Sequence, residues 1–160
     1  MKKMRIGFGF DVHPLAAGRD FWLGGIKIAH EKGGVGHSDA DVMIHAICDA
    51  LLGAANLGDI GKHFPDTSSA YKNIDSKLLL KRVMELLAEK NFSVGNVDVT
   101  LCLQKPKIAP HIPLMLSTLS KVMNIPEEDI SIKATTTEKL GYVGREEGVS
   151  CYAVALVEKQ

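Results

Sequence analysis

The stretch SDADVMIHAICDALLG, residues 38–53, decides the fold because it predicts a helix that is apolar on nearly every side. Ser38 is the expected N-cap, and Asp41 follows three residues later, as in a variant of the capping box. A helix that is apolar all round is buried in the protein interior. Its polar exceptions lie four residues apart and form one stripe, made of Asp41, His45 and Asp49. The other segments are therefore expected to pack around this helix.

The flanking segments predict strands and further helices. Residues 97–104 alternate between apolar and polar side chains, a period of two that is typical of a half-buried strand. Other strands are expected at about 5–13, 130–136 and 150–157, a small hairpin at 21–28, and helices at about 75–90 and 113–123. The glycine-rich run 32–36 predicts a mobile loop.

This order of elements predicts an α+β fold. We expect one domain over residues 1–160, a mixed β-sheet with helices packed on one face, as in a chorismate-mutase-like or ferredoxin-like sandwich. The length of 160 residues, with 46% hydrophobic and 24% charged residues, excludes disordered, fibrous and membrane classes.

Charge and cysteine content narrow the function classes. Nineteen basic residues balance nineteen acidic ones, so we expect no nucleic-acid partner and no membrane partner. Any anionic ligand must then be held by a local site. The three cysteines, Cys48, Cys102 and Cys151, are odd in number and lie in apolar contexts, which argues against a disulfide framework and favours the cytoplasm.

One carboxylate and two imidazoles form a candidate metal site. Asp11 and His13 are alternate residues of the first predicted strand and point the same way, and His45 on the buried helix is the candidate third ligand. These three ligands suit zinc and leave its fourth coordination position open for water or substrate. Asp49 or Asp41 could orient the His45 ring by contacting the nitrogen that does not bind the metal. The alternative is two hydrogen-bonded histidines and two capping acids, and the spacing does not decide between them.

Two further segments could bind phosphate. Residues 37–39 lie at the start of the buried helix, where free N–H groups favour anions. Local grounds favour a capping role for Ser38 and Asp39, whereas His37 is a candidate for contacting charge. The run 133–139 holds three threonines, two lysines and Glu138, which suits phosphoryl oxygens and a cation such as Mg²⁺, or else forms a solvated strand edge.

Several common catalytic motifs do not occur in the sequence. It has no G-x-x-x-x-G-K-[ST] phosphate loop, no complete dinucleotide fingerprint, no G-x-S-x-G and no H-E-x-x-H. These absences disfavour a P-loop ATPase, a Rossmann dehydrogenase, a serine hydrolase and a zincin. Arg145, between glycine-rich turns, is a candidate for a bidentate partner.

Taken in order, the motifs resemble those of the 2-C-methyl-D-erythritol 2,4-cyclodiphosphate synthase family, of the non-mevalonate isoprenoid pathway. The resemblance runs from Arg5 to about Leu156. Its most specific blocks are GFDVH at 9–13, HSDAD at 37–41 with HA at 45–46, GDIG at 58–61, FPD at 64–66, GNVD at 95–98 and KATTTEK at 133–139.

The resemblance implies a lyase that cyclises its substrate. In 4-diphosphocytidyl-2-C-methyl-D-erythritol 2-phosphate, the 2-phosphate attacks the β-phosphorus, CMP leaves and a cyclic diphosphate forms. Zn²⁺ and a second cation, Mg²⁺ or Mn²⁺, are the implied cofactors. The resemblance also implies a homotrimer with active sites between subunits.

Site residues carry over from the family by position. The implied metal ligands are Asp11, His13 and His45 for zinc and Glu138 for the second cation, and the implied catalytic residues are His37 and Thr136. Substrate contacts would come from Ser38, Asp59, Ile60, Gly61, Phe64, Asp66, Tyr142 and Arg145. The cytidine pocket would be formed by Leu103, Lys107, Ile108, Ala109, Ala134 and Thr135.

Two departures and two alternatives accompany the resemblance. Tyr142 stands where phenylalanine is frequent in the family, and Leu103 is larger than the usual residue at the cytosine wall. The alternatives are a zinc-dependent phosphohydrolase, in which metal-bound hydroxide attacks a phosphoester, and a non-catalytic zinc-stabilised binding module. Structural zinc usually has a fourth protein ligand, often cysteine, and no cysteine here has suitable spacing.

Overall fold

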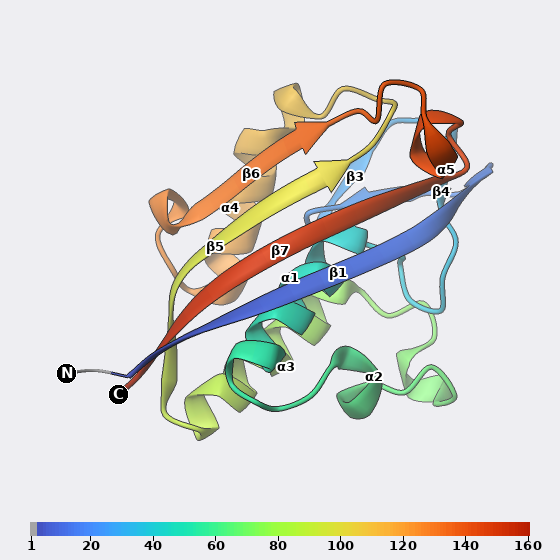
Figure 1. Cartoon of the computed structure of the whole chain (residues 1–160). Coiled ribbons are helices and arrows are strands. Elements are labelled where there is room, and N and C mark those ends of the chain that lie inside the picture. Colours follow the sequence, from blue (N-terminus) through green and yellow to red (C-terminus); the bar gives the residue numbers. More distant parts are fainter. Residues whose placement is uncertain (1–2) are drawn as a thin grey trace.

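A five-stranded sheet forms one layer of the protein, seen in a computed structural model that describes residues 3–160 (Figure 1). Its strand order is β4-β1-β7-β5-β6. The strands are β1 (Met4–Ala17), β4 (Lys32–Gly34), β5 (Phe92–Cys102), β6 (Ile130–Thr135) and β7 (Gly148–Lys159). Only β5 and β6 are parallel to each other, and the other pairs are antiparallel, so the sheet is mixed as predicted.

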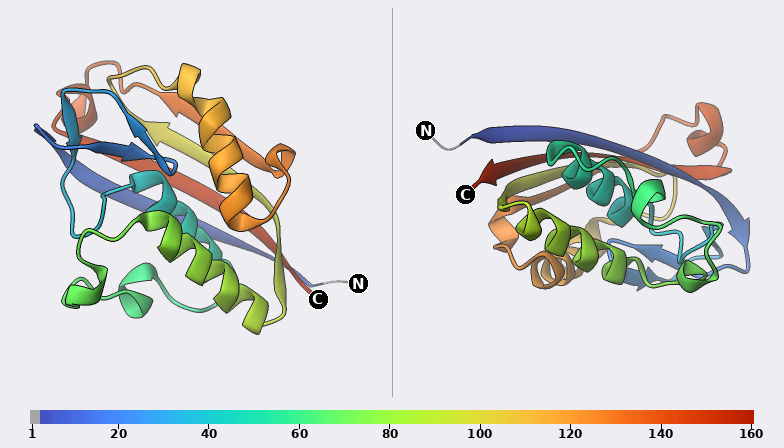
Figure 2. Two further views of the ribbon diagram at one scale, coloured as in Figure 1. Left: turned by 180° about the vertical axis from the view of Figure 1, so that it is seen from behind. Right: turned by 90° about the horizontal axis from the view of Figure 1, so that it is seen from below.

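The helices cover one face of this sheet (Figure 2). They are α1 (Val42–Ala54), α2 (Ile60–His63), α3 (Ser76–Glu89) and α4 (Ile112–Met123), with 3-10 turns η1 (Ser69–Tyr71), η2 (Ala109–His111) and η3 (Glu127–Asp129), whereas the short α5 (Gly141–Gly144) lies beside the start of β7 and away from these helices. A separate hairpin, β2 (Phe21–Leu23) and β3 (Ile26–Ile28), lies on the same side. The predicted α+β fold class is confirmed, and no helix among residues 3–160 is both long and apolar enough to cross a bilayer.

Helix α1 is the central element because it lies between the sheet and α3 (Figure 2). Most of its side chains have no exposed surface, which explains why the sequence is apolar on all sides. Two glycines of β1 let the helix approach the strand. A Cβ at Gly7 would lie 1.9 Å from the Ala50 carbonyl oxygen, and one at Gly9 would lie 1.9 Å from the Ala46 carbonyl oxygen.

Two local expectations were wrong. The N-cap of α1 is Asp41 rather than Ser38, because the Asp41 carboxylate accepts from the Ile44 N–H and also from the Gly24 and Gly25 N–H groups of the hairpin turn. The glycine-rich run is not a loop throughout, since residues 32–34 form β4 and pair with the end of β1.

The two faces of β1 differ in character. Its odd-numbered residues from Gly7 to His13 face the helices, whereas the even-numbered residues point to the side of the sheet that carries no helix. On that bare side the exposed residues are mainly large and apolar: Met4, Ile6, Phe8, Phe10 and Val12 of β1, with Tyr152 and Val154 of β7.

We predict that Gly9→Ala destabilises the protein. The added methyl group would overlap the backbone of α1 and force strand and helix apart, at a cost of about 1–3 kcal/mol in the free energy of unfolding. The control is Gly53→Ala in α1, where an added Cβ has no heavy atom within 4 Å. That control should be neutral or stabilising, because alanine favours helix by roughly 0.5–1 kcal/mol. Urea denaturation measures both, and equal stability of Gly9→Ala and the wild type would contradict the packing argument.

Candidate active site

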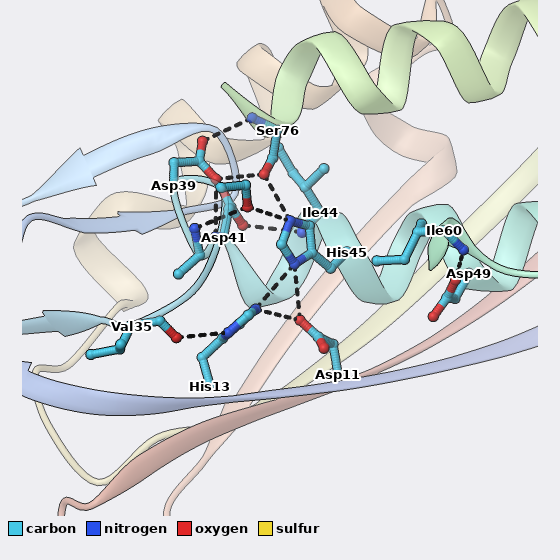
Figure 3. A network of polar contacts seen from close by, with 12 residues as sticks. Asp11, His13, Val35, Asp39, Asp41, Ile44, His45, Asp49, Ile60 and Ser76 are labelled. Carbon is cyan, nitrogen blue, oxygen red and sulfur yellow. Dashed lines mark hydrogen bonds and ion pairs between the residues drawn. The ribbon is translucent and has the colours of Figure 1, made fainter. Parts of the chain in front are cut away.

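Asp11, His13 and His45 converge on one point, as predicted (Figure 3). The Asp11 Oδ2 atom lies 2.8 Å from His13 Nε2 and 3.1 Å from His45 Nδ1, and the two nitrogens are 3.1 Å apart. The first two residues come from β1 and the third from α1, so the close packing of these elements builds the cluster.

The donor set and spacing fit a tetrahedral metal ion with an open position. Bonds of about 2.0–2.2 Å place neighbouring ligands of a tetrahedral zinc ion roughly 3.3 Å apart, slightly more than the distances in this cluster. In the part of the chain that the structure describes, no other group of three or more His, Cys, Asp or Glu side chains has such an arrangement. The cluster is therefore a possible metal site with three protein ligands.

The electrostatics of the cluster couple the carboxylate to the imidazoles. Burial alone raises the pKa of Asp11, but the hydrogen bonds and positive charge of His13 and His45 outweigh it and hold this pKa at about 2, against an ordinary value of 3.8. Burial alone lowers the pKa of His45, but the Asp11 carboxylate, helped by Asp41 and Asp39, raises it above its ordinary 6.5. Without a metal, the site therefore favours an added proton on His45.

Each imidazole is held by its second nitrogen. His13 Nδ1 lies 3.2 Å from the Val35 carbonyl oxygen, which can only accept, so this nitrogen carries the proton and Nε2 is left free for a metal. His45 Nε2 lies 2.9 Å from Ser76 Oγ and 3.1 Å from Ser38 Oγ. The remaining nitrogens, His13 Nε2 and His45 Nδ1, therefore face Asp11.

The expectation that Asp41 or Asp49 orients His45 was wrong. Asp41 is occupied with three backbone N–H groups at the start of α1. Asp49 accepts from the Ile60 N–H at 2.8 Å and so fixes the start of α2 (Figure 3). The group next to His45 is instead Ser76, at the start of α3.

The cluster opens onto a cavity of about 490 Å³. Most of the predicted phosphate-binding and substrate-binding residues line it: His37, Ser38, Ile60, Gly61, Phe64 and Asp66. Asp59 does not line this cavity; its carboxylate accepts from the Lys62 N–H and caps α2. If the cluster at its wall bound a metal ion, such a cavity could hold and polarise a phosphate ester.

A second, smaller cavity of about 190 Å³ collects the predicted cytidine-binding residues. Its lining includes Leu103, Lys107, Ile108, Ala109, Ala134 and Thr135, together with Thr136. It lies where β5 and β6 end and the 105–111 segment begins. Six residues predicted for one ligand therefore share one cavity.

The remaining predicted residues line neither cavity in the single chain. Glu138 is exposed and does not belong to the cluster of Asp11, His13 and His45. Arg145 has the expected bidentate partner, but this is Glu147 of the same chain, at 2.9 and 3.2 Å. Tyr142 lies on α5 and is partly exposed.

Comparison with known proteins identifies the family. A family model described as the YgbB family matches residues 4–158. The chain belongs to the YgbB family, that of the 2-C-methyl-D-erythritol 2,4-cyclodiphosphate synthases. A synthase of this name from Bacteroides thetaiotaomicron is 64% identical over 157 residues, which are 98% of this chain and 99% of that protein.

Solved structures agree with this synthase family. The bifunctional IspDF of Campylobacter jejuni superposes with a TM-score of 0.96 at 38% identity, over 100% of this chain and 43% of that longer one. A CDP complex of IspF from Plasmodium falciparum gives 0.87 at 34% identity, over 100% of this chain and 99% of that one. The predicted resemblance is confirmed, and with it an isoprenoid-pathway synthase that forms a cyclic diphosphate with release of CMP, a phosphorus–oxygen lyase.

Sequence reasoning missed several residues that line the two cavities. Tyr71, Ile74 and Leu79 line the larger cavity, and Gln104 lines the smaller one. Tyr71 stacks edge-on against Phe64, with ring centroids 5.5 Å apart. The sequence offered one usable signal, the aromatic side chain of Tyr71 within the polar segment 66–73, because aromatic residues in polar loops often belong to binding surfaces.

We predict that binding of Zn²⁺, used here as the probe, releases a proton. His45 must be neutral to bind a metal, and its raised pKa means that it is protonated in a larger share of metal-free molecules than an ordinary histidine. The affinity should therefore fall by up to about tenfold for each pH unit below the pKa of His45. Titration calorimetry in buffers of different ionisation enthalpy measures the protons released.

The control for this titration is His111→Ala, which removes an imidazole outside the cluster. It should release the same number of protons as the wild type. An affinity that stays constant between about pH 6 and pH 8 would contradict the assignment of His45 as a ligand.

Proposed function

We propose that the protein converts 4-diphosphocytidyl-2-C-methyl-D-erythritol 2-phosphate to the 2,4-cyclodiphosphate, with zinc held by Asp11, His13 and His45. The observation that carries the proposal is the convergence of these three side chains at the wall of a cavity that a phosphate ester can enter. Membership of the synthase family supports the reaction, and the cluster would be its site.

The chemistry needs no nucleophilic side chain. An oxygen of the 2-phosphate forms a bond to the β-phosphorus, the bond from that phosphorus to the bridging oxygen breaks, and CMP leaves with this oxygen. Phosphoryl transfer depends mainly on positioning and charge neutralisation. Zinc, when bound, would neutralise phosphate charge and polarise the attacked group.

The protein's own residues then have to fold the substrate. Attack within one molecule gains from orientation, which can supply about 7–11 kcal/mol of the barrier. His37, which lines the cavity before α1, would position and stabilise the transition state, and Ser38 and Asp66 would contact the methylerythritol part. Phe64 and the segment of Ile60 and Gly61 would close around the carbon skeleton.

The cytidine part would bind in the smaller cavity. Lys107 supplies positive charge and the other side chains supply an apolar wall: Leu103, Ile108, Ala109, Ala134 and Thr135. Thr136 lies at the same cavity and would stabilise the transition state, while Glu138, two residues on, would help to hold Mg²⁺ or Mn²⁺ on the diphosphate. Tyr142 on α5 and Arg145 directly after it would also contact the substrate. Asp59, the N-cap of α2, would contact its methylerythritol part.

Active sites between subunits would bring the two cavities together. We infer a homotrimer in which the zinc cluster of one chain faces the cytidine cavity of the next. The bare face of the sheet supports an assembly, because its exposed apolar side chains, such as Phe8 and Ile6, form the kind of patch that marks interfaces. A single domain over residues 1–160 and a cytoplasmic location complete the proposal.

The decisive test is release of CMP from the cytidylylated substrate in ¹⁸O-enriched water. We expect CMP and a cyclic diphosphate that contains no label, because both reacting phosphates belong to the substrate. A zinc phosphohydrolase would place solvent oxygen in a released phosphate group. A binding module would release no CMP, so either of these results would overturn the proposal.

We predict that Phe8→Glu breaks the assembly. A carboxylate in the apolar face cannot be buried without a partner, so the chains should separate. Sedimentation should give three times the chain mass of 17.3 kDa for the wild type and one chain mass for the variant. The control is Leu78→Glu on α3, which is similarly exposed and should leave the mass unchanged. A wild-type protein that sediments as a single chain would refute the trimer.

A further inference from the structure

The second nitrogen of His45 is held by Ser76, which is bonded in turn to Asp39. We propose that Asp39 and Ser76 act as a positioning pair that fixes the tautomer and the ring orientation of His45. The inference rests on the proposed metal site, because it concerns how this ligand is prepared. Neither residue belongs to the predicted ligand set.

Hydrogen bonds link three side chains in a row: His45 on α1, Ser76 at the start of α3, and Asp39 in the segment before α1 (Figure 3). Ser76 Oγ lies 2.9 Å from His45 Nε2 and donates to Asp39 Oδ1 at 2.5 Å. Ser76 has no exposed surface and His45 is only 5% exposed, so water does not compete for these contacts.

The direction of each hydrogen bond follows from the number of protons available. A serine hydroxyl has one proton, and a carboxylate can only accept. Since the Ser76 proton is directed to Asp39, the lone pair of Oγ is left to accept from His45 Nε2. His45 therefore carries its proton on Nε2, and the lone pair of Nδ1 points to the metal position beside Asp11.

Asp39 is itself held firmly. Its Oδ2 atom accepts from the backbone N–H of Ser76 at 2.8 Å, and its Oδ1 atom also accepts from the Asp41 N–H at 3.1 Å. The Asp39 N–H in turn donates to the Ile74 carbonyl oxygen. Asp39 thus joins the segment before α1 to the start of α3, and the orientation of His45 depends on this junction.

Ser38 is the competing partner for the same nitrogen, but it differs in two ways. Its Oγ atom is slightly farther from His45 Nε2, at 3.1 Å, and it accepts the Ala40 N–H rather than donating to an acid. Ser38 also lines the large cavity, whereas Ser76 does not. Ser38 is therefore placed to contact substrate, and Ser76 acts only through His45.

The test compares zinc affinity in Ser76→Ala and in Asp39→Asn with that of the wild type, by competition with a chromophoric chelator at fixed pH. Ser76→Ala should weaken Zn²⁺ binding by roughly 10- to 100-fold, as expected on loss of a group that orients a ligand. Asp39→Asn keeps the serine hydroxyl but replaces an acceptor with an amide that can donate to it. The hydroxyl can then turn its proton to His45, so the affinity should fall in the same way.

The matched controls are Ser38→Ala and Ser117→Ala. Ser38→Ala should keep zinc affinity within a few-fold and raise KM instead, and Ser117→Ala on α4 should change neither. Nitrogen-15 NMR of the zinc-loaded protein adds a readout that a loss of stability would not produce. The wild type should show His45 protonated at Nε2 only, and each of the two weakened variants should show broadened or altered signals of this ring.

The outcomes separate the two proposals. A wild type that binds no zinc would refute the metal site itself. A wild type that binds zinc, with Ser76→Ala and Asp39→Asn binding it equally well and keeping the same His45 signal, would refute the positioning pair alone. Should Ser76→Ala fail to fold, Asp39→Asn decides the question by the same two measurements.

Discussion

The close contact between β1 and α1 is the constraint on which the rest of the structure depends. It exists because Gly7 and Gly9 have no Cβ where the backbone of the helix passes. Gly9 meets the helix at Ala46, and Asp11, the next residue on the same face of the strand, meets it at His45. The packing that forms the core therefore also assembles the cluster, and no separate loop is needed to bring the ligands together.

The alternation of β1 gives the strand two functions. On the face toward the helices stand two glycines followed by Asp11 and His13, and on the other face stand exposed apolar side chains. Because side chains of a strand alternate, a shift of one residue in its pairing with β7 would exchange the faces. It would bury the apolar residues against α1 and move both Asp11 and His13 away from His45, so the register is strongly fixed.

Much of the fold and of the site could be predicted from the sequence, because the strongest signals are local. The apolar run with one polar stripe at 38–53 and the alternation at 97–104 predicted a helix and a strand that the structure contains as α1 and β5. The Asp-Val-His spacing placed two side chains on one face of a strand, and the cluster followed once the buried helix was assigned. Family resemblance added the cavity residues, which periodicity alone does not distinguish from turns.

What sequence reasoning missed depends on contacts distant along the chain. Asp41 is the N-cap because the hairpin turn at Gly24 and Gly25 adds two further donors, which a local capping rule does not include. The run 32–34 becomes a strand because the end of β1 offers it a partner. The residue that orients His45 is Ser76, which lies 31 positions later in the chain. In the sequence alone, Ser76 is recognisable only as a residue at the start of a helix.

The central claim is that Asp11, His13 and His45 share one metal ion. The most direct measurement is anomalous X-ray scattering, recorded on both sides of the zinc absorption edge from crystals grown with excess Zn²⁺. We predict one strong peak within about 2.0–2.2 Å of Asp11 Oδ2, His13 Nε2 and His45 Nδ1, with the fourth position open to the cavity. A site without a peak, with these three side chains bonded only to one another, would contradict it.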